Sequence, residues 1–484
     1  MELRRREFLV GATTAIPAAR AGVLGPDRAQ ASQSLPDSSD EVRERLEVWM
    51  RFGQPLEIVI RDFQRTFDGW EAMGVNGIVL GRMSFRDDNG KDIPAFPPNP
   101  RIYSGLGVRP PQAPAKEFRD RRRQLDQMLD EARRRKWPVM IFAPDAGADT
   151  GGGWGAAFTN PHPWAARILD TLSQFPQVDG GIIDGPEWGY EIDPGHRSNI
   201  FEDLPDAARK LVESMHYDFH QLKQATDRLF ARLHQLDAKA VTSYSGGGLL
   251  GATRLFHSDP ELTSWMRFRT EAVTSTVKLL KGLMTEQRKD LRLGMGPRTA
   301  AFAPLCGYDF SELLNYLDYL LPKHYFWHRG VDGLYGTVYR WMRTLTEWNP
   351  GLKEGQALDV VKAWFGLDLP GVTKALDFER GFPDDFFTKV VATETRRALA
   401  ATDSPERIIP WLDIGRRPHR GDPMGTGDFL RILEASRKAG LRRFLYHNYT
   451  HITPGEAEVM RVLCGGGKRE LPRGLVLPDI DMYQ

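Results

Sequence analysis

Three carboxylates lie close together in residues 184–191, at Asp184, Glu187 and Glu191, next to the aromatic side chain of Trp188. The apolar run before Asp184 predicts a buried strand, and the Gly-Pro pair after it predicts a turn. Carboxylates beside aromatic rings suit sugar chemistry, in which an ionised group stabilises or attacks an oxocarbenium-like centre and a protonated one donates to the leaving oxygen. We expect Asp184 to be the ionised group. Glu187 would be the acid, because the apolar face of Trp188 disfavours its charged form.

The same two carboxylates also have an ordinary structural interpretation. Asp184 could cap its loop, and Glu187 could pair with a nearby arginine. A second catalytic carboxylate is therefore sought on another strand. Asp413 follows the apolar run 408–412 and is the first candidate, and Asp145, which follows another apolar run, is the second. Capping of a loop is the alternative for either residue.

Polar and aromatic side chains at the ends of other expected strands could bind sugar hydroxyls or stack on a sugar ring. A core role, or an ion pair for the arginine, is the alternative for each of them. The candidates for substrate binding are Asp145, Trp188, Tyr190, Arg298, Lys323, His324, Tyr325, Trp327, His447 and Asn448.

Short apolar runs separated by amphipathic stretches must position these residues. Such runs are typical of strands buried on both faces of a parallel sheet, and eight of them favour a (β/α)8 barrel, with an open doubly wound sheet as the alternative. The expected strands are residues 56–60, 77–81, 139–143, 180–184, 291–295, 319–324, 408–414 and 444–449. The expected helices are residues 62–73, 118–136, 163–174, 206–236, 260–289 and 427–439.

The spacing of the strands predicts two long insertions, residues 185–290 after the fourth strand and residues 326–405 after the sixth. Both would follow the C-terminal end of a strand, where barrel enzymes place their active sites. We therefore expect the two insertions to lie together and to form the walls of a cleft, with the proline-rich residues 93–114 as a further loop on that face.

Two segments carry a resemblance to known proteins. Residues 178–185, Val-Asp-Gly-Gly-Ile-Ile-Asp-Gly, resemble the fourth strand of several glycoside hydrolase barrel families, in which a V-D-G-x-x-x-D pattern leads to the catalytic acid. Residues 318–327, Asp-Tyr-Leu-Leu-Pro-Lys-His-Tyr-Phe-Trp, resemble a D-Y-[apolar]-x-P-x-x-Y-x-W strand of glycosyl-hydrolase-like barrels. By position, the resemblance implies that Asp184 is the strand-four acid and that Tyr325 and Trp327 face the sugar.

The chain also departs from the pattern that it resembles. In the clan with two catalytic glutamates, an asparagine precedes the glutamate of strand four, whereas Pro186 precedes Glu187 here. Asp413 stands where that clan has a glutamate nucleophile.

The first residues predict an export signal. Arg5-Arg6-Glu7-Phe8-Leu9 and the mildly apolar residues 10–24 resemble a twin-arginine signal, and Ala29-Gln30-Ala31 fits a cleavage site. We expect residues 1–31 to be removed after export by the twin-arginine translocase, and the mature protein to lie in the periplasm or outside the cell. An ordinary secretory signal or a basic N-terminus is the alternative.

Composition excludes several other classes of protein. The formal net charge of +1 argues against nucleic-acid binding, and the chain after the signal holds no apolar run long enough to cross a membrane. We expect no cofactor, and no metal among the site residues: the two cysteines cannot make a four-thiolate zinc site, and His216 and His220 lack the glutamate of an H-E-x-x-H motif.

The expected organisation follows from these observations. Residues 32–53 form a linker and lead-in, residues 54–464 the barrel, and residues 465–484 a C-terminal tail. The leading hypothesis is an exported glycoside hydrolase that cleaves an oligo- or polysaccharide with a carboxylate pair at the C-terminal face of the barrel. A non-catalytic carbohydrate-binding barrel is the alternative, and a cofactor-dependent oxidoreductase has no motif to support it.

Overall fold

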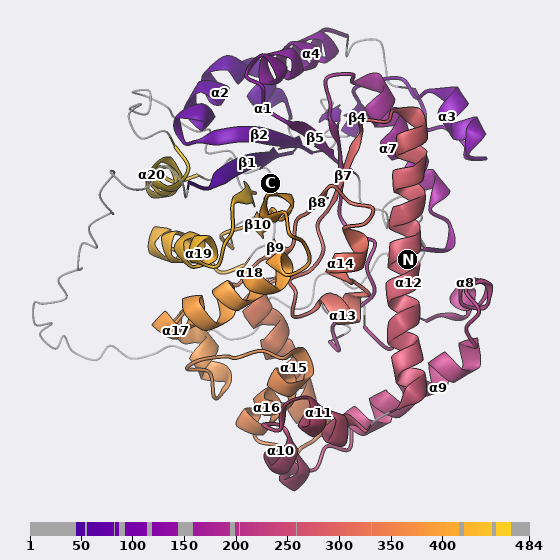
Figure 1. Ribbon diagram of the computed structural model, residues 1–484, viewed down its shortest axis with the longest axis vertical. Coiled ribbons are helices and arrows are strands. Elements are labelled where there is room, and N and C mark those ends of the chain that lie inside the picture. Colours follow the sequence, from indigo (N-terminus) through magenta and orange to yellow (C-terminus); the bar gives the residue numbers. More distant parts are fainter. Residues whose placement is uncertain are drawn as a thin grey trace, which may run out of the picture. The chain divides into compact units, whose positions relative to one another are not determined.

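Parallel strands form the centre of the structure, and helices lie around them (Figure 1). The structure is a computed structural model, and it describes residues 45–465 except 54–55, 82, 87–91, 114–118, 144–157, 194–198, 203, 258, 331, 416–420 and 448–451. The expected signal, residues 32–44 of the expected linker and the expected C-terminal tail after residue 465 lie outside the described residues.

The strands follow one another around the sheet in the order of the sequence. Within the described residues the sheet has nine strands in the order β8-β7-β6-β5-β2-β1-β11-β10-β9, and every neighbouring pair is parallel. They are β1 (Glu47–Phe52), β2 (Val75–Leu80), β5 (Val139–Phe142), β6 (Gly180–Ile183), β7 (Arg292–Met295), β8 (Tyr319–Leu320), β9 (Lys323–His324), β10 (Trp411–Leu412) and β11 (Arg443–Tyr446).

The sheet closes into a barrel through residues 319–324. β8 and β9 are two parts of this one segment, with Leu321 and Pro322 between them. β8 pairs with β7 on one side and β9 pairs with β10 on the other, so the two ends of the sheet meet here. The nine strands therefore occupy eight positions around a closed parallel sheet, which confirms the expected (β/α)8 barrel.

The first expected strand is wrong. Residues 56–60 belong to helix α1 (Leu56–Arg61), and the first barrel strand is β1, within the stretch assigned to the lead-in. β1 carries Glu47 and Arg51, so it is less apolar than the run that was chosen in its place. Its pairing with β2 and β11, two strands far apart in the chain, is what places it in the sheet.

Helices cover the outside of the barrel. Between the strands and after the last of them lie α1, α2 (Phe63–Ala72), α4 (Arg119–Arg134), α7 (His162–Gln174), α12 (Pro260–Gln287), α13 (Ala303–Cys306), α14 (Phe310–Leu313), α18 (Ala392–Leu399), η5 (Pro405–Arg407), α19 (Thr426–Lys438) and α20 (Pro454–Leu463). Five of the six expected helices correspond to α2, α4, α7, α12 and α19. Within the described residues, no helix has both the length and the apolar character needed to cross a lipid bilayer.

The two long insertions pack against each other, as the sequence predicts. The insertion after β6 contains η2 (Asp206–Ala208), α8 (Arg209–Ser214), α9 (Phe219–Leu233), α10 (Ala238–Tyr244) and α11 (Gly248–Phe256), followed by α12, so the single helix expected over residues 206–236 is broken. The insertion after β9 contains α15 (Leu334–Trp348), α16 (Glu354–Phe365), η3 (Ala375–Arg380), α17 (Asp384–Phe386) and η4 (Phe387–Val391), followed by α18. α10 and α11 contact α16 (Figure 1). The side chain of Asn349 accepts the backbone N–H of Leu236 at 2.9 Å.

The proline-rich residues 93–114 are only partly a loop. They begin in β4 (Asp92–Pro94), which forms a small antiparallel hairpin with β3 (Ser84–Arg86). They continue into the short helix α3 (Pro100–Gly105), which packs against α7. The side chain of Asn99 caps α3, and the carboxylate of Asp170 accepts the backbone N–H of Asn99 at 3.1 Å.

The barrel interior is filled with large side chains because alternate strand residues point inward. The inward cluster consists of Trp49, Val79, Met140, Ile182, Tyr319, Leu321, Tyr325, Trp327, Ile409, Trp411 and Leu445, with Phe142 packed against it. Gly296 faces the Trp411 ring, and a Cβ added at Gly296 would lie 3.2 Å from it, so a larger residue would crowd the indole. This alternation also determines which polar residues face inward at the C-terminal ends of the strands.

Candidate active site

Five polar residues form the inner rim of the barrel, a name used here for Arg51, Asp184, Lys323, Asp413 and His447. In the sequence, each of them comes two residues after a member of the inward cluster, near the C-terminal end of its strand. The sheet register therefore points these side chains into the mouth of the barrel, where (β/α)8 enzymes place their catalytic groups.

Asp184 and Lys323 form an ion pair across the inner rim. The Lys323 Nζ donates a hydrogen bond to the Asp184 Oδ1 at 2.6 Å. The carboxylate side chain is 25% exposed, whereas the lysine side chain is 4% exposed. Burial lowers the pKa of Lys323 and the charge of Arg298 adds to this, while the charges of Asp184 and Glu187 act in the opposite direction. Asp184 is thus a fixed carboxylate that solvent reaches.

Asp413, His447 and Arg51 form a second charged group of the inner rim. The His447 Nδ1 and the Asp413 Oδ2 are 2.9 Å apart, and the other carboxylate oxygen accepts the backbone N–H of Gly415 at 3.0 Å. The Arg51 guanidinium contacts the His447 Nε2 and lies 4.4 Å from the centre of the Phe142 ring. A guanidinium can only donate, so this arrangement assigns the imidazole proton to Nδ1, directed at Asp413.

Tyr325 and Trp327 pack against each other beside the inner rim, and both rings are buried, so their packing does not support the sugar contact expected from the sequence. Their rings stack with centroids 4.6 Å apart, and both side chains belong to the inward cluster. Burial raises the pKa of Tyr325, and the charges of Asp413 and Asp184 add to the effect, so the phenol keeps its proton. The charges of both carboxylates of the inner rim therefore act on the Tyr325 hydroxyl.

Glu187 lies outside the inner rim, in a buried ion pair. The Arg298 Nε donates to both carboxylate oxygens of Glu187, at 2.9 and 2.8 Å, and the Tyr308 hydroxyl donates to Oε2 at 3.0 Å. Arg298 also contacts Asp332, and the side chains of Arg298 and Glu187 are 3% and 4% exposed.

This pairing differs from the apolar surroundings that the sequence suggested for Glu187. Burial by itself would lower the pKa of Arg298, but the charges of Glu187 and Tyr190 outweigh it and raise that pKa well above its usual value. Burial, with the Glu187 charge added, raises the pKa of Tyr308. A permanent cation and a hydroxyl donor stabilise the charged form of a carboxylate. The structure therefore corrects the apolar environment expected for Glu187 as a proton donor. Its contacts are those of the alternative given above, an ion pair with a nearby arginine.

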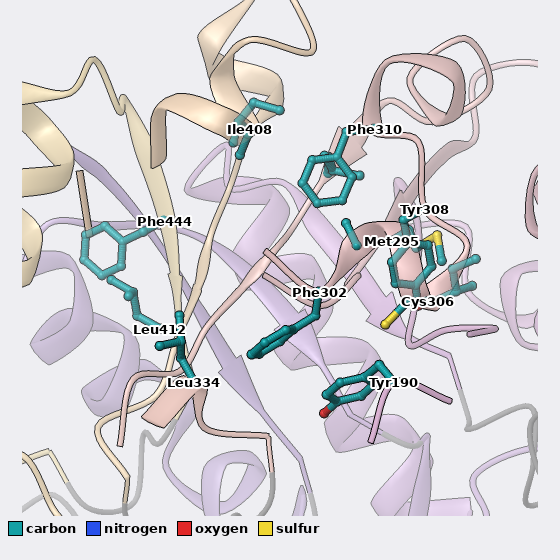
Figure 2. Close-up of a cluster of buried hydrophobic side chains, with 14 of the residues drawn as sticks. Tyr190, Met295, Phe302, Cys306, Tyr308, Phe310, Leu334, Ile408, Leu412 and Phe444 are labelled. Atoms are coloured by element: carbon teal, nitrogen blue, oxygen red, sulfur yellow. The ribbon is translucent and has the colours of Figure 1, made fainter. Parts of the chain in front are cut away.

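Trp188 and Tyr190, in the loop after β6, pack against the hydrophobic core outside the inward cluster. The Trp188 ring stacks on Phe158 with centroids 4.4 Å apart, and its indole N–H donates to the backbone oxygen of Arg269 at 3.0 Å. The Tyr190 ring stacks on Phe302 at 5.4 Å (Figure 2). Both side chains are buried in the hydrophobic core outside the inward cluster, between the strands and the surrounding helices, which is called the outer core here. Their packing therefore does not support the substrate contact expected from the sequence.

Glu191 ties the loop to the second insertion. Its carboxylate accepts from the Arg340 Nη2 at 2.7 Å and from the Thr337 hydroxyl at 2.8 Å, both on α15. The side chain of Glu191 is fully buried. These contacts stabilise the position of the loop that follows Asp184.

His324 points away from the barrel interior. It pairs in register with Leu412, which belongs to the outer core, whereas its neighbours Lys323 and Tyr325 face inward. Burial lowers the pKa of His324 to about 3, so the ring is neutral near pH 7. Neither ring nitrogen has a hydrogen-bond partner among the described residues. The alternation of the strand therefore places this candidate outside the site.

Two other candidates, Asp145 and Asn448, lie outside the described residues. Within the part of the chain that the structure describes, no group of three or more histidine, cysteine, aspartate and glutamate side chains could hold a metal ion.

The sequence interpretation missed Arg51, Tyr308 and Asp332. Arg51 was missed because β1 was not recognised as a strand. The available signal was the arginine near the end of the otherwise apolar run of residues 48–52. Tyr308 and Asp332 lie in irregular segments, and no local pattern predicts their contacts with Glu187 and Arg298.

Comparisons with known proteins identify similar folds at low identity. No family model matches the sequence, and no curated protein matches it. Among solved structures, the chain is similar to the PgaB (BpsB) glycoside hydrolase domain from Bordetella bronchiseptica, at 12% identity and a TM-score of 0.45, over 87% of this chain and 98% of that one. It is also similar to the catalytic domain of a β-amylase from Paenibacillus polymyxa, at 9% identity and a TM-score of 0.43, over 88% and 99% of the two chains. A β-galactosidase from Halorubrum lacusprofundi matches at 13% identity and a TM-score of 0.42, over 83% of this chain and 52% of that one. At these scores, the likenesses say nothing about the substrate of this protein.

Proposed function

We propose that this protein is a glycoside hydrolase that cleaves an oligo- or polysaccharide at the C-terminal mouth of its barrel. Asp184 is the central carboxylate, which stabilises or attacks the oxocarbenium-like centre, and the buried Asp413 contributes indirectly, through the His447 ring that it contacts. Lys323 holds Asp184 in position through the hydrogen bond from its ammonium to the Asp184 Oδ1.

The exposure of Asp184 is the observation that carries this proposal. Its side chain is 25% exposed on the inner rim, whereas those of Glu187 and Asp413 are 4% and 0% exposed. A carboxylate that acts on a substrate must be both fixed and reachable. Asp184 combines the two, because a buried strand leads into it and a buried ammonium holds its Oδ1.

The pairing of the other two carboxylates favours a second candidate function. Glu187 is bound by Arg298 and Tyr308, and Asp413 is bound by His447, so neither is prepared in this structure as a protonated acid. A barrel of this kind with no working acid pair would bind carbohydrate without cleaving it. This is the alternative to be tested against hydrolysis.

A screen on chromogenic glycosides and on plant and algal polysaccharides distinguishes the two functions. The wild-type protein should hydrolyse at least one substrate, and Asp184→Asn should lower kcat/KM by about 10²–10³-fold, as loss of an electrostatic transition-state contact does. Asp290→Asn, at an exposed position before β7 at the opposite end of the barrel, is the matched control and should keep full activity. Binding of a polysaccharide by both wild type and Asp184→Asn, with no hydrolysis by either, would support the carbohydrate-binding function instead.

We further propose that the protein is exported by the twin-arginine translocase. The Arg5-Arg6 pair and the apolar residues after it support this. Replacing both arginines by lysine should retain the precursor in the cytoplasm in a folded state, which fractionation and immunoblotting would measure. Normal export of this variant would rule out the twin-arginine route.

A further inference from the structure

Two adjacent leucines in the first long insertion are strongly exposed. Leu249 is 83% exposed and Leu250 is 82% exposed. The other exposed large apolar residues in the described part of the chain are Phe230, Tyr244 and Leu376, at 40%, 38% and 59%. Single exposed apolar residues are ordinary, whereas a contiguous group of them indicates an interaction site. We propose that Tyr244, Leu249 and Leu250, called the apolar tip here, bind the surface of an anionic lipid bilayer, independently of the proposed hydrolysis.

The backbone around the apolar tip is open to solvent. Residues 246–248 are all glycine, and they lie where α10 meets α11. A Cβ added at Gly246 or Gly248 would come within 4 Å of no atom beyond its neighbours in the chain. Leu249 and Leu250 follow in the first turn of α11. α10 and α11 lie beside α16, away from the strands of the barrel (Figure 1). A flat surface can therefore reach the two leucine side chains without any change in the fold.

The core of the insertion does not use these leucines. Further along α11, Leu255 and Phe256 are buried in the outer core, and the Phe256 ring packs edge-on against Trp364 of α16 with centroids 4.6 Å apart. A helix that only covers protein keeps its apolar residues on the covered face and polar residues on the other. Helix α11 departs from this rule, because it fills the core with its later residues and still leaves two leucines in water.

The charge of the same segment favours an anionic surface. Residues 238–258 contain no aspartate or glutamate, and their two basic residues, Lys239 and Arg254, are both exposed. The Arg254 guanidinium lies 5.9 Å from the centre of the Tyr244 ring, so a positive charge stands beside the apolar tip. Basic residues at such a position are attracted to anionic lipid headgroups.

The neighbouring acidic residues have other partners. Asp237, just before the segment, caps α10 by accepting the backbone N–H of Ala240 at 2.8 Å. Asp259, just after it, accepts from the Arg228 Nε at 2.7 Å. α16 and its N-cap residue together carry two lysines and two acidic residues, so this helix is neutral as a whole. The two basic residues of the segment are thus available to headgroups.

The first turn of α11 also suits lipid phosphates. Its N-cap residue is Gly247, and no side-chain hydrogen bond caps this end of the helix. The first backbone N–H groups of a helix need acceptors and attract anions. Leucines in the same turn would enter the boundary between headgroups and acyl chains, where tyrosine rings also gather. Apolar, basic and N–H groups therefore meet at one end of α11, as the layers of an anionic bilayer surface require.

A second copy of the chain fits the apolar tip less well. Stable protein interfaces bury about 800 Å² on each partner and use about 20–30 residues a side. Three side chains offer far less. A symmetric dimer would also place the tip, with its basic residues, against itself, and like charges repel.

Vesicle binding tests the proposal. The full chain is mixed with vesicles of equal parts phosphatidylcholine and phosphatidylglycerol, and the bound fraction is measured by sedimentation. Leu249→Ser/Leu250→Ser should weaken binding by about 100-fold or more, because burial of each leucine accounts for roughly tenfold or more. The midpoint of thermal unfolding should not change, since both side chains are exposed. Leu376→Ser, at an exposed leucine on η3, is the matched control and should bind as the wild type does. Equal binding by the wild type and the double variant would overturn the proposal.

The basic residues are tested by a second double variant. Lys239→Gln/Arg254→Gln should bind the mixed vesicles roughly 30-fold more weakly, the effect expected of two charges at a membrane surface. Binding to vesicles of phosphatidylcholine alone should change little. An equal loss on both kinds of vesicle would refute the selection of an anionic surface.

A fluorophore locates the contact on the protein. Leu250→Cys labelled with the polarity-sensitive dye NBD should emit more strongly and at shorter wavelength when the mixed vesicles are added. Glu286→Cys, at an exposed position on α12, is the control and should not respond. Burial raises the pKa of the native thiols Cys306 and Cys464, which slows their labelling. The same response at both labelled positions, or none at residue 250, would overturn the proposal, even if the basic N-terminal residues bind lipid.

Sedimentation velocity without lipid tests the other occupant. The wild type and Leu249→Ser/Leu250→Ser should sediment alike at every protein concentration. A dimer that forms in the wild type and is lost in the double variant would assign the apolar tip to a second copy of the chain instead.

Discussion

Asp184 and Glu187 are three residues apart, yet they lie in opposite environments. Asp184 faces the barrel interior, where it forms an ion pair with Lys323 and a quarter of the carboxylate side chain stays exposed. Glu187 lies behind the rim, where Arg298 and Tyr308 bind both of its oxygens in a fully packed layer. The difference teaches that charge pairing by itself does not identify a catalytic carboxylate. Access decides, because a group sealed by partners can stabilise a loop but cannot meet a substrate.

The same contrast holds between the inner and outer faces of the sixth barrel position. Lys323 and Tyr325 face the barrel interior, while His324 between them lies in the outer core. Polar groups on the inner face are paired across the barrel, and water reaches Asp184 there. The outer layer is dry, so each polar group within it must be paired inside the protein or remain neutral.

The largest change in stability is expected from breaking the buried ion pair of Glu187 and Arg298. Glu187→Gln leaves the buried Arg298 guanidinium short of one negative partner, so it should lower the free energy of unfolding by roughly 3–5 kcal/mol. Chemical denaturation measures this, and Glu286→Gln on the exposed face of α12 is a control that should change little. A loss below about 1 kcal/mol would show that the protein tolerates substitution at Glu187 as well as it tolerates substitution at the inner rim, against the contrast drawn here.

A smaller effect, dependent on pH, is expected at His324. Its pKa is about 3 in the folded protein, below the unperturbed value of about 6.5, so between these values the unfolded chain binds one more proton. Stability should therefore fall as the pH is lowered from about 6.5, by up to about 1.4 kcal/mol per pH unit from this residue.

Substitution of His324 tests that origin directly. Unfolding midpoints between pH 7 and pH 4 should fall less steeply in His324→Leu than in the wild type. His220→Gln, at an exposed position, is the control and should keep the wild-type slope. Equal slopes in all three proteins would mean that His324 is not held neutral in the folded state.

The smallest change in stability is expected at the inner rim. Lys323→Met removes the ammonium but leaves Asp184 partly exposed, so water can hydrate the carboxylate and the free energy of unfolding should fall by only about 1 kcal/mol. Activity should fall by at least tenfold, since the carboxylate loses the partner that positions it. Parallel unfolding and kcat/KM measurements check both parts, and a stability loss as large as that of Glu187→Gln would break the contrast between the two layers.

Much of the fold could be predicted from the sequence because its signals are local. Short apolar runs at 139–143, 180–184 and 291–295 correspond to β5, β6 and β7, and periodic apolar positions give α4 and α19. The failure at residues 56–60 has the same origin. That run is more apolar than β1, and only the pairing of β1 with β2 and β11 shows which segment belongs to the sheet.

The candidate site was predictable only in part. Strand ends and residue types indicated Asp184, Lys323, Tyr325, Asp413 and His447, all of which face the barrel interior. The same signals also selected Trp188, Tyr190 and His324, which lie in the outer core. Their residue types suit sugar binding equally well, and nothing local distinguishes the two sets.

The sequence by itself determined that strands and helices alternate, and that carboxylates and aromatic residues follow the strands. Tertiary structure decided which of those side chains reach the barrel mouth. The reason is geometric: a closed sheet turns alternate residues of a strand to opposite faces, so His324 and Tyr325 separate although they are neighbours in the chain. Pairing is decided in the same way, because Arg298, which seals Glu187, is 111 residues away in sequence and meets it only when the barrel closes.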